Sequence, residues 1–395
     1  MSRRRRTLFE EYDGPVAHIT VYKYGAMFTP VERHKQNSKH NISTQILDRP
    51  AIISKIYHLL SIHRQKTEEA LQQNKILKQC HLKPCHDCSS SLHIALQKAI
   101  RLCYNQKIGE SRLYPVGELF LELFHCGGDT SALFSPLLDA NLIRRSHSGN
   151  EILYPKKDAA NIHITFEYYL NHVCNINTTV ISDSQFAASI KNTDLINKEI
   201  GHNSGILPLS AAIHKRDPAF VLILLRYGAD PFHSLEANSS SYEDHIRNPT
   251  ENVIDDLNGL FLFKNTAFSD NICAQLAAEE AKVWTCLTYI RRAVPGIDLT
   301  SCTHIITSSG YDSDDKVNEP RKPVPMGPKY NLLPKLADKI DLKFFKKTSS
   351  LKQLCRCVVR QKLQANCKTI GSIPKGINLL PLPRLLKDYL DLQTD

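Results

Sequence analysis

Apolar side chains recur at steps of three and four residues along most of this chain, which is the spacing of one face of an α-helix. Such stripes occupy residues 52–77, 91–104, 116–124, 131–142, 164–173 and 272–290. Alternation with a period of two, which is typical of half-buried strands, is rare. The sequence therefore predicts an all-α protein.

The order of these segments predicts the domain organisation. Residues 1–50 carry arginine runs and isolated aromatic residues without periodicity, and we expect a poorly ordered basic extension there. Residues 51–305 are expected to form one helical domain. Residues 306–330 change from acidic to proline-rich, which indicates a linker before the C-terminal segment.

The N-terminus and the cysteines indicate an intracellular protein. Met1 is followed by Arg3–Arg6, and not by the apolar segment of about 7–15 residues that a secretory signal contains. The longest apolar run, residues 220–225, is far shorter than the roughly 20 residues that span a bilayer. We therefore expect a cytoplasmic chain with 12 reduced cysteines and no membrane partner, and the basic run leaves a nuclear location open.

The net charge of +10 belongs to one end of the chain. Residues 321–395 hold 16 Lys and Arg residues against 5 Asp and Glu residues, so the preceding part is close to neutral. These charges alternate with apolar residues, as on the solvated face of an amphipathic helix. Nucleic acid is therefore not the expected partner.

Residues 203–232 contain a characteristic helical hairpin pattern. Leu207-Pro208-Leu209-Ser210 opens a short helix, and Gly228-Ala229-Asp230 follows a second apolar helix. This segment resembles an ankyrin repeat, although Leu207 and Ser210 replace the usual Thr and His. The residues expected to build the repeat are Pro208, Leu209, Ala211, Ala212, Leu224, Leu225 and Gly228.

A single repeat cannot bury its own faces. We therefore expect degenerate repeats in the helical stripes before residue 200 and after residue 250, in a number that the sequence leaves open. Gly228 is expected to adopt the left-handed conformation that ends a helix.

An amphipathic helix is predicted at residues 350–363. Its apolar side is expected to carry Leu351, Leu354, Cys355, Val358 and Leu363, and its solvated side Lys352, Arg356, Arg360 and Lys362. About twenty residues later, Leu380-Pro381-Leu382-Pro383 precedes a short helix. There the prolines favour extended backbone, and Leu385, Leu386, Tyr389 and Leu390 are predicted to share an apolar face.

These two motifs resemble the BC box and the cullin box of a SOCS box, here spanning residues 345–393. Together with the repeat, they resemble the ankyrin repeat and SOCS box family, and in particular its divergent branch that contains member seventeen. The resemblance implies that Leu351, Leu354, Cys355 and Val358 bind Elongin C, which carries Elongin B. It also implies that Leu380, Pro381, Leu382 and Pro383 bind cullin 5 with its RING-box subunit.

By this resemblance the chain is a non-catalytic substrate adaptor of a ubiquitin ligase, and its repeats bind a protein that the sequence does not identify. No phosphate-binding loop, nucleophile elbow or His-Glu-x-x-His helix occurs. We therefore expect neither an enzyme nor a cofactor.

One further cluster supports a different interpretation. Cys80, Cys85 and Cys88, together with His81 and His86, are candidate zinc ligands, although structural zinc usually takes two separated ligand pairs. The alternative function is a helical repeat scaffold, zinc-stabilised or not, whose C-terminal helix packs internally and recruits no ligase. An adaptor leaves Leu351 and Cys355 exposed, whereas such a scaffold buries them, so the exposure of these two residues discriminates between the two functions.

Overall fold

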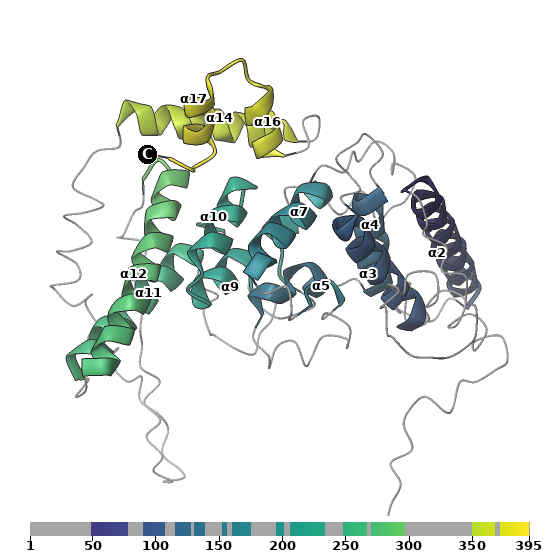
Figure 1. Cartoon of the computed structure of the whole chain (residues 1–395), viewed down its shortest axis with the longest axis horizontal. Coiled ribbons are helices and arrows are strands. Elements are labelled where there is room, and N and C mark those ends of the chain that lie inside the picture. Colours follow the sequence, from purple (N-terminus) through teal and green to yellow (C-terminus); the bar gives the residue numbers. More distant parts are fainter. Residues whose placement is uncertain are drawn as a thin grey trace, which may run out of the picture. The chain divides into compact units, whose positions relative to one another are not determined.

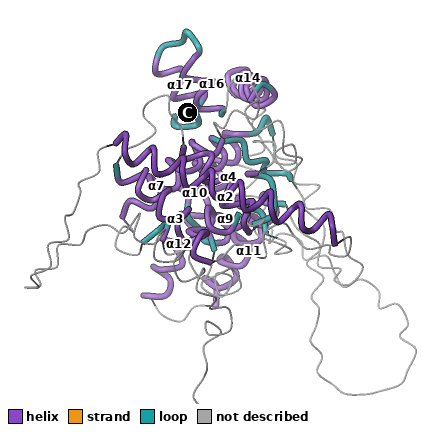
Figure 2. Tube along the Cα trace, turned by 90° about the vertical axis from the view of Figure 1, so that its right-hand side faces the viewer, coloured by secondary structure: helices purple, strands orange, loops and turns teal. Residues whose placement is uncertain are grey.

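The structure is a computed structural model that describes residues 49–77, 90–106, 115–127, 130–138, 152–155, 160–174, 195–200, 206–233, 248–266, 270–296, 350–367 and 372–394. These residues form helices joined by turns and loops, and none of them forms a strand (Figure 2). The mostly helical prediction is therefore confirmed for this part of the chain. Among the described helices, none is long and apolar enough to cross a membrane.

The chain divides into two compact units. One comprises residues 1–195 with 199–204, and the other comprises 196–198 with 205–395. Several expectations lie outside the described residues: nearly all of the N-terminal extension, the linker at 306–330, and the zinc candidates Cys80, Cys85 and Cys88.

The first unit is built around a central apolar helix, α4 (Pro115–Gly127). It packs against α2 (Arg49–Leu77), α3 (Ser90–Asn105) and α7 (Ile162–Cys174). Phe120 of α4 and Tyr169 of α7 meet edge to face, with ring centroids 5.3 Å apart. Aromatic packing of this kind stabilises the centre of the unit.

The apolar stripe at residues 131–142 does not form one continuous α-helix over its described part, residues 131–138. The helix α5 (Ser131–Phe134) changes into a 3₁₀ turn, η1 (Ser135–Leu137), and the backbone is extended at Leu138. Pro136 accounts for the break, because its ring and its missing N–H do not fit the interior of an α-helix.

The second unit begins with the hairpin of α9 (Pro208–His214) and α10 (Pro218–Arg226). Both helices start with proline, whose missing N–H is harmless in the first turn. The carboxylate of Asp217 caps α10 by accepting hydrogen bonds from the amides of Ala219 and Phe220. All seven residues expected to build the repeat are buried: Pro208, Leu209, Ala211, Ala212, Leu224, Leu225 and Gly228.

Helix α10 ends in a Schellman motif. The amide of Ala229 donates to the carbonyl of Leu224, and the amide of Gly228 donates to that of Leu225. Gly228 has a φ of +100°, so it adopts the positive-φ conformation predicted for it.

A second hairpin follows in α11 (Pro249–Thr266) and α12 (Asp270–Ala293). Asn248 and Glu251 form a reciprocal capping box at the start of α11. Helix α11 packs against α9, and α12 packs against α10. The two hairpins are therefore stacked with first helix on first and second helix on second.

Three further helices are described in this unit: α14 (Leu351–Ala365), α16 (Ile373–Leu379) and α17 (Arg384–Leu390), drawn in yellow in Figure 1. They enclose a small apolar core of Leu363, Cys367, Ile373, Ile377, Tyr389 and Leu390. Helix α14 also contacts α12.

Candidate docking surface on the C-terminal helices

Helix α14 has a well-defined start. The hydroxyl of Ser350 accepts a hydrogen bond from the amide of Gln353 at 3.2 Å, as expected of an N-cap serine. Leu351 is thus the first helical residue, which fixes the direction of every later side chain on this helix.

One face of α14 is apolar and open to solvent. Leu351 is 76% exposed, Val358 is 54% exposed and Leu354 is 40% exposed. The thiol-bearing Cys355 between them is also exposed. These four residues form what we call the open face of α14, and large exposed apolar surfaces of this kind mark interaction sites.

The opposite face of α14 is buried and contains two arginines, Arg356 and Arg360. The prediction that both lie on a solvated face is wrong. The prediction that Leu363 shares a face with Leu351 is also wrong, because twelve residues turn an α-helix by about 120° beyond whole turns. Leu363 lies in the core with Tyr389 and Leu390.

Arg360 can be buried because its guanidinium meets carbonyl oxygens from two other helices. It donates to the carbonyl of Leu390 at 2.9 Å and to that of Leu225 at 2.6 Å. A further contact reaches the carbonyl of Arg226 at 3.3 Å. Burial lowers the pKa of Arg360 to about 10, so the side chain is still protonated at neutral pH.

Arg356 packs on an aromatic ring. Its guanidinium carbon lies 3.5 Å from the centroid of the Tyr389 ring, and Nη2 donates to the carbonyl of Thr394 at 3.0 Å. The ammonium group of Lys352 lies 4.2 Å from the same centroid. Cation–π contacts of this kind stabilise the pairing of α14 with the C-terminal end of α17.

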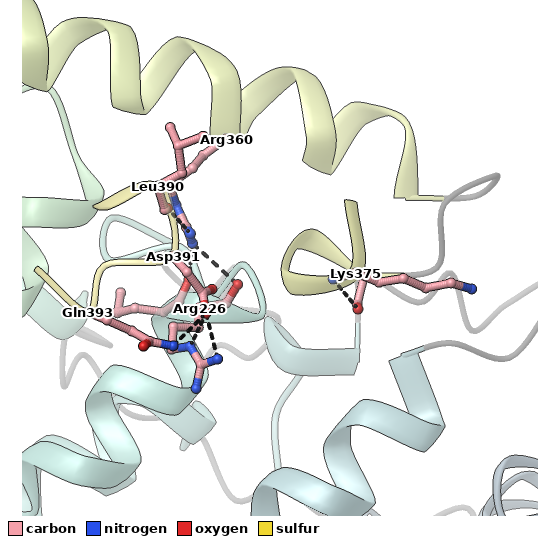
Figure 3. A network of polar contacts seen from close by, with 8 residues as sticks. Arg226, Arg360, Lys375, Leu390, Asp391 and Gln393 are labelled. Atoms are coloured by element: carbon pink, nitrogen blue, oxygen red, sulfur yellow. Dashed lines mark hydrogen bonds and ion pairs between the residues drawn. The ribbon is translucent and has the colours of Figure 1, made fainter. Parts of the chain in front are cut away.

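A partly buried ion pair connects the C-terminal end of the chain to α10 (Figure 3). Arg226 donates through Nε at 2.9 Å and through Nη2 at 2.5 Å to Oδ2 of Asp391. The side-chain amide of Gln393 donates to the same oxygen at 3.0 Å. Both charged side chains are largely shielded from water, so solvent weakens their attraction less than it weakens the attraction within a surface ion pair.

The predicted cullin-binding residues lie between α16 and α17. Leu380 and Pro383 have extended backbone dihedral angles, as predicted. Pro381, Leu382 and Pro383 are exposed, whereas Leu380 is partly buried against the small core. The short segment therefore offers a preformed, mostly exposed edge.

The apolar face predicted for α17 divides in two. Leu385 is 72% exposed and Leu386 is 45% exposed, whereas Tyr389 and Leu390 are buried in the core. The four residues lie within about 140° around the axis of α17 and so share one side of the helix, but the core covers only its last turn. The first turn of α17 faces solvent, and only its end packs inward.

Residues 347–391 match the family model of the SOCS box. This chain contains a SOCS box. The matched segment covers α14, α16 and α17 and lies within the predicted span of 345–393. No curated protein and no solved structure matches the chain.

Within the SOCS box, the four residues expected to bind Elongin C lie together on the open face, at successive turns of α14. The four residues expected to bind cullin follow α16. The buried polar contacts of Gln353, Arg356 and Arg360 were not predicted. Their only trace in the sequence is the i, i+4 spacing of the two arginines beside the apolar stripe.

No group of three potential metal ligands occurs within the residues that the structure describes. Cys103 and Cys286 are buried, and burial raises the pKa of each thiol to about 12. Neither thiol is therefore activated as a nucleophile.

Proposed function

We propose that this chain is the substrate-receptor subunit of an Elongin B/C–cullin ubiquitin ligase. The observation that supports the proposal most strongly is the open face of α14, which exposes apolar side chains inside a segment that matches the SOCS box. A SOCS box indicates an adaptor role of this type. A scaffold whose C-terminal helix packs internally would bury this face.

In this proposal the chain supplies no catalytic group. Leu351 and Cys355 insert into Elongin C, and Leu354 and Val358 widen the contact. Cullin then brings the RING-box subunit and the ubiquitin-loaded conjugating enzyme. The adaptor accelerates transfer by holding the lysines of a bound substrate close to that enzyme.

The substrate would bind to the stacked hairpins of α9–α10 and α11–α12, which we propose are ankyrin-type repeats. Their support is the pairing of α11 with α9 and of α12 with α10. Successive units stacked in register are the architecture of a repeat solenoid. Proline at the first position of α9 and of α11 gives both hairpins the same start.

We further propose cullin 5 as the cullin, on the basis of the segment from Leu380 to Pro383. The amide of Leu382 donates to the carbonyl of Leu380 at 2.8 Å, and a preformed segment loses little conformational freedom on binding. The test is a pull-down of cullin 5 and of cullin 2 by the complete chain with Elongin B/C. The double variant Pro381→Ala, Pro383→Ala should lose cullin 5 while keeping Elongin, and equal capture of cullin 2 by the wild type would refute the choice.

The main proposal is tested with the full chain and purified Elongin B/C in size-exclusion chromatography and a binding titration. We expect a stable complex. The variant Leu351→Asp, Cys355→Asp should bind at least about 100-fold more weakly, because unpaired carboxylates buried at an apolar interface cost several kcal/mol.

The matched control is Ile164→Asp, which places the same carboxylate on a 64% exposed apolar position of the first unit. This variant should bind Elongin like the wild type. A folded wild-type chain that does not co-elute, or a double variant that still does, would favour the scaffold function. Zinc content at Cys80, Cys85 and Cys88 would then be the next measurement.

A further inference from the structure

The side of α14 that faces away from solvent contacts the ends of two hairpin helices. The side-chain amide of Gln353 lies 2.8 Å from the carbonyl of Arg291, 3.0 Å from that of Arg292 and 3.0 Å from that of Val294. The carbonyls of Arg291 and Arg292 lie in the last turn of α12 and that of Val294 directly follows it, which is where side-chain donors commonly cap a helix. Gln353 therefore caps α12.

Arg360 makes the equivalent contact with α10. Its Nη2 donates to the carbonyl of Leu225 at 2.6 Å, and this carbonyl lies in the last turn of α10. A guanidinium is well suited to this place, because the C-terminal end of a helix carries partial negative charge.

A third contact lies four residues further along α14. Gln364 donates to the carbonyl of Gly228 at 3.2 Å. A Cβ atom at Gly228 would lie 3.3 Å from Nε2 of Gln364 and 3.2 Å from Cδ1 of Ile373. The glycine therefore allows the SOCS box to approach the end of α10 closely, in addition to its positive φ.

Gln353 and Arg360 are seven residues apart, which is about 10 Å along a helix. Two attachment points at this separation fix both the position and the direction of the α14 axis. The ion pair between Arg226 and Asp391 and the burial of Leu363 oppose rotation about that axis.

We propose that Gln353 and Arg360 are positioning residues that hold the open face of α14 in one orientation relative to the hairpins α9–α10 and α11–α12. The inference rests on the proposed adaptor function. It adds that the ligase and the repeats are joined by a rigid contact, and that the linker before the SOCS box does not set their geometry. A fixed orientation raises the effective concentration of substrate lysines at the conjugating enzyme more than a flexible connection does.

The test measures the orientation directly in the complete, Elongin-free chain. Nitroxide-bearing amino acids are introduced at Ala219 of α10 and at Leu351 of α14, both of which are exposed. Pulsed electron paramagnetic resonance then gives the distribution of distances between them. We expect one narrow distribution for the otherwise wild-type chain.

The variant is Gln353→Glu, which turns a donor to three carbonyls into a carboxylate that they repel. The distance distribution should become about twofold wider or more, because the first half of α14 is released while Arg360 still holds the second. The matched control is Gln361→Glu, since Gln361 is an exposed glutamine on the same helix. It should leave the distribution unchanged.

Elongin affinity is measured separately on the unlabelled variants. For Gln353→Glu it should stay within about threefold of the wild type, which corresponds to less than 1 kcal/mol. Absence of Elongin binding by the wild type would refute the proposed function, whereas the distance measurement would remain informative because it needs no Elongin.

A broad wild-type distribution would overturn the inference. So would a Gln353→Glu variant that unfolds at lower denaturant concentration but keeps the narrow distribution, because this is the result of a purely stabilising contact. If Gln353→Glu prevents folding, Gln353→Met is used instead, because it removes the donor without adding charge. A widened distance distribution of this variant would support the inference, and an unchanged narrow one would overturn it.

Discussion

Arg360 is a residue whose burial carries a large energetic consequence. Its guanidinium satisfies carbonyls of Leu225 and Leu390, which belong to elements far apart in the sequence. Removing such a donor leaves buried acceptors without partners, and each of these costs about 1–3 kcal/mol. The side chain also fills space beneath α14, so its loss removes packing contacts in addition to the hydrogen bonds.

We therefore expect Arg360→Gln to lower the free energy of unfolding of the second unit by about 2–4 kcal/mol. Trp284 is the only tryptophan of the chain and lies in α12 of this unit, so its fluorescence in a urea titration reports on this unit. Arg384→Gln is the control, because the Arg384 side chain is 94% exposed. Equal effects of the two substitutions would show that the carbonyl contacts of Arg360 contribute nothing.

Two cysteines on α14 differ in exposure, and their reactivity therefore tests which side of the helix faces solvent. Cys355 is exposed, whereas Cys357 is buried and its thiol lies 3.7 Å from the carbonyl of Ala293. Burial raises the pKa of Cys357, which reduces its reactive thiolate form further.

Iodoacetamide should therefore modify Cys355 rapidly in the free chain and Cys357 slowly, as followed by mass spectrometry of the α14 peptides. Elongin B/C at saturating concentration should protect Cys355 by at least about tenfold, since a residue inserted into a partner is shielded from solvent. Cys357 serves as the internal reference, and unchanged labelling of Cys355 in the complex would place Elongin elsewhere.

The exposed residues of α14 could be predicted from sequence, but the buried ones could not. Leu351, Leu354, Cys355 and Val358 follow helical spacing and match a known motif. A prediction from helical periodicity places an arginine on the solvent-exposed side of a helix, because the pattern contains no information about partners elsewhere in the chain. The carbonyl that receives Arg360 lies 135 residues away in the sequence, and no local pattern contains that information.

At the scale of elements, α7 contains a histidine that should make the first unit sensitive to pH. His172 is buried and packs edge to face against Tyr168, with ring centroids 4.4 Å apart. Burial lowers its pKa from 6.5 to about 4, because the charged form is poorly solvated there.

The folded state therefore binds fewer protons than the unfolded state between about pH 6.5 and pH 4. Stability contributed by neutral His172 is complete above pH 6.5 and should fall by about 3 kcal/mol as the pH approaches 4. The protection factors of amides in α7, which are the exchange rates corrected for the intrinsic rate at each pH, should fall as the pH is lowered over this range.

His172→Phe should remove this part of the pH dependence, because phenylalanine fills the site without titrating. The control is His163→Phe on the same helix, where the histidine is only partly buried. A His172→Phe chain with an unchanged pH profile would assign the effect to other groups.

The helices themselves were largely predictable, because three- and four-residue spacing follows directly from helix geometry. Residues 131–142 are the exception, since the apolar stripe continues through Pro136 while the backbone does not. The pairing of α11 with α9 and of α12 with α10 needed the structure, because it depends on contacts between segments and not on the pattern within either.

At the scale of the whole molecule, the SOCS box shares its polar contacts with the hairpins. Gln353 donates to a carbonyl of α12, Arg360 donates to a carbonyl of α10, and Gln364 donates to the carbonyl of Gly228, two residues after α10. Arg226 of α10 binds Asp391 at the C-terminal end. A fragment that starts after the linker lacks every one of these partners.

We therefore expect residues 345–395 alone to be poorly helical, because isolated helices of about 15 residues are marginal in water and Arg360 would lose the carbonyls of Leu225 and Arg226. Residues 196–395, which retain both hairpins, should be helical and unfold cooperatively. Circular dichroism at increasing urea concentration distinguishes the two, and Elongin B/C should bind the longer chain more tightly because it needs no ordering of α14 on binding. A short fragment with full helicity and the same Elongin affinity would show that the SOCS box is an independent module, and the contacts to α10 and α12 would then act on its orientation alone.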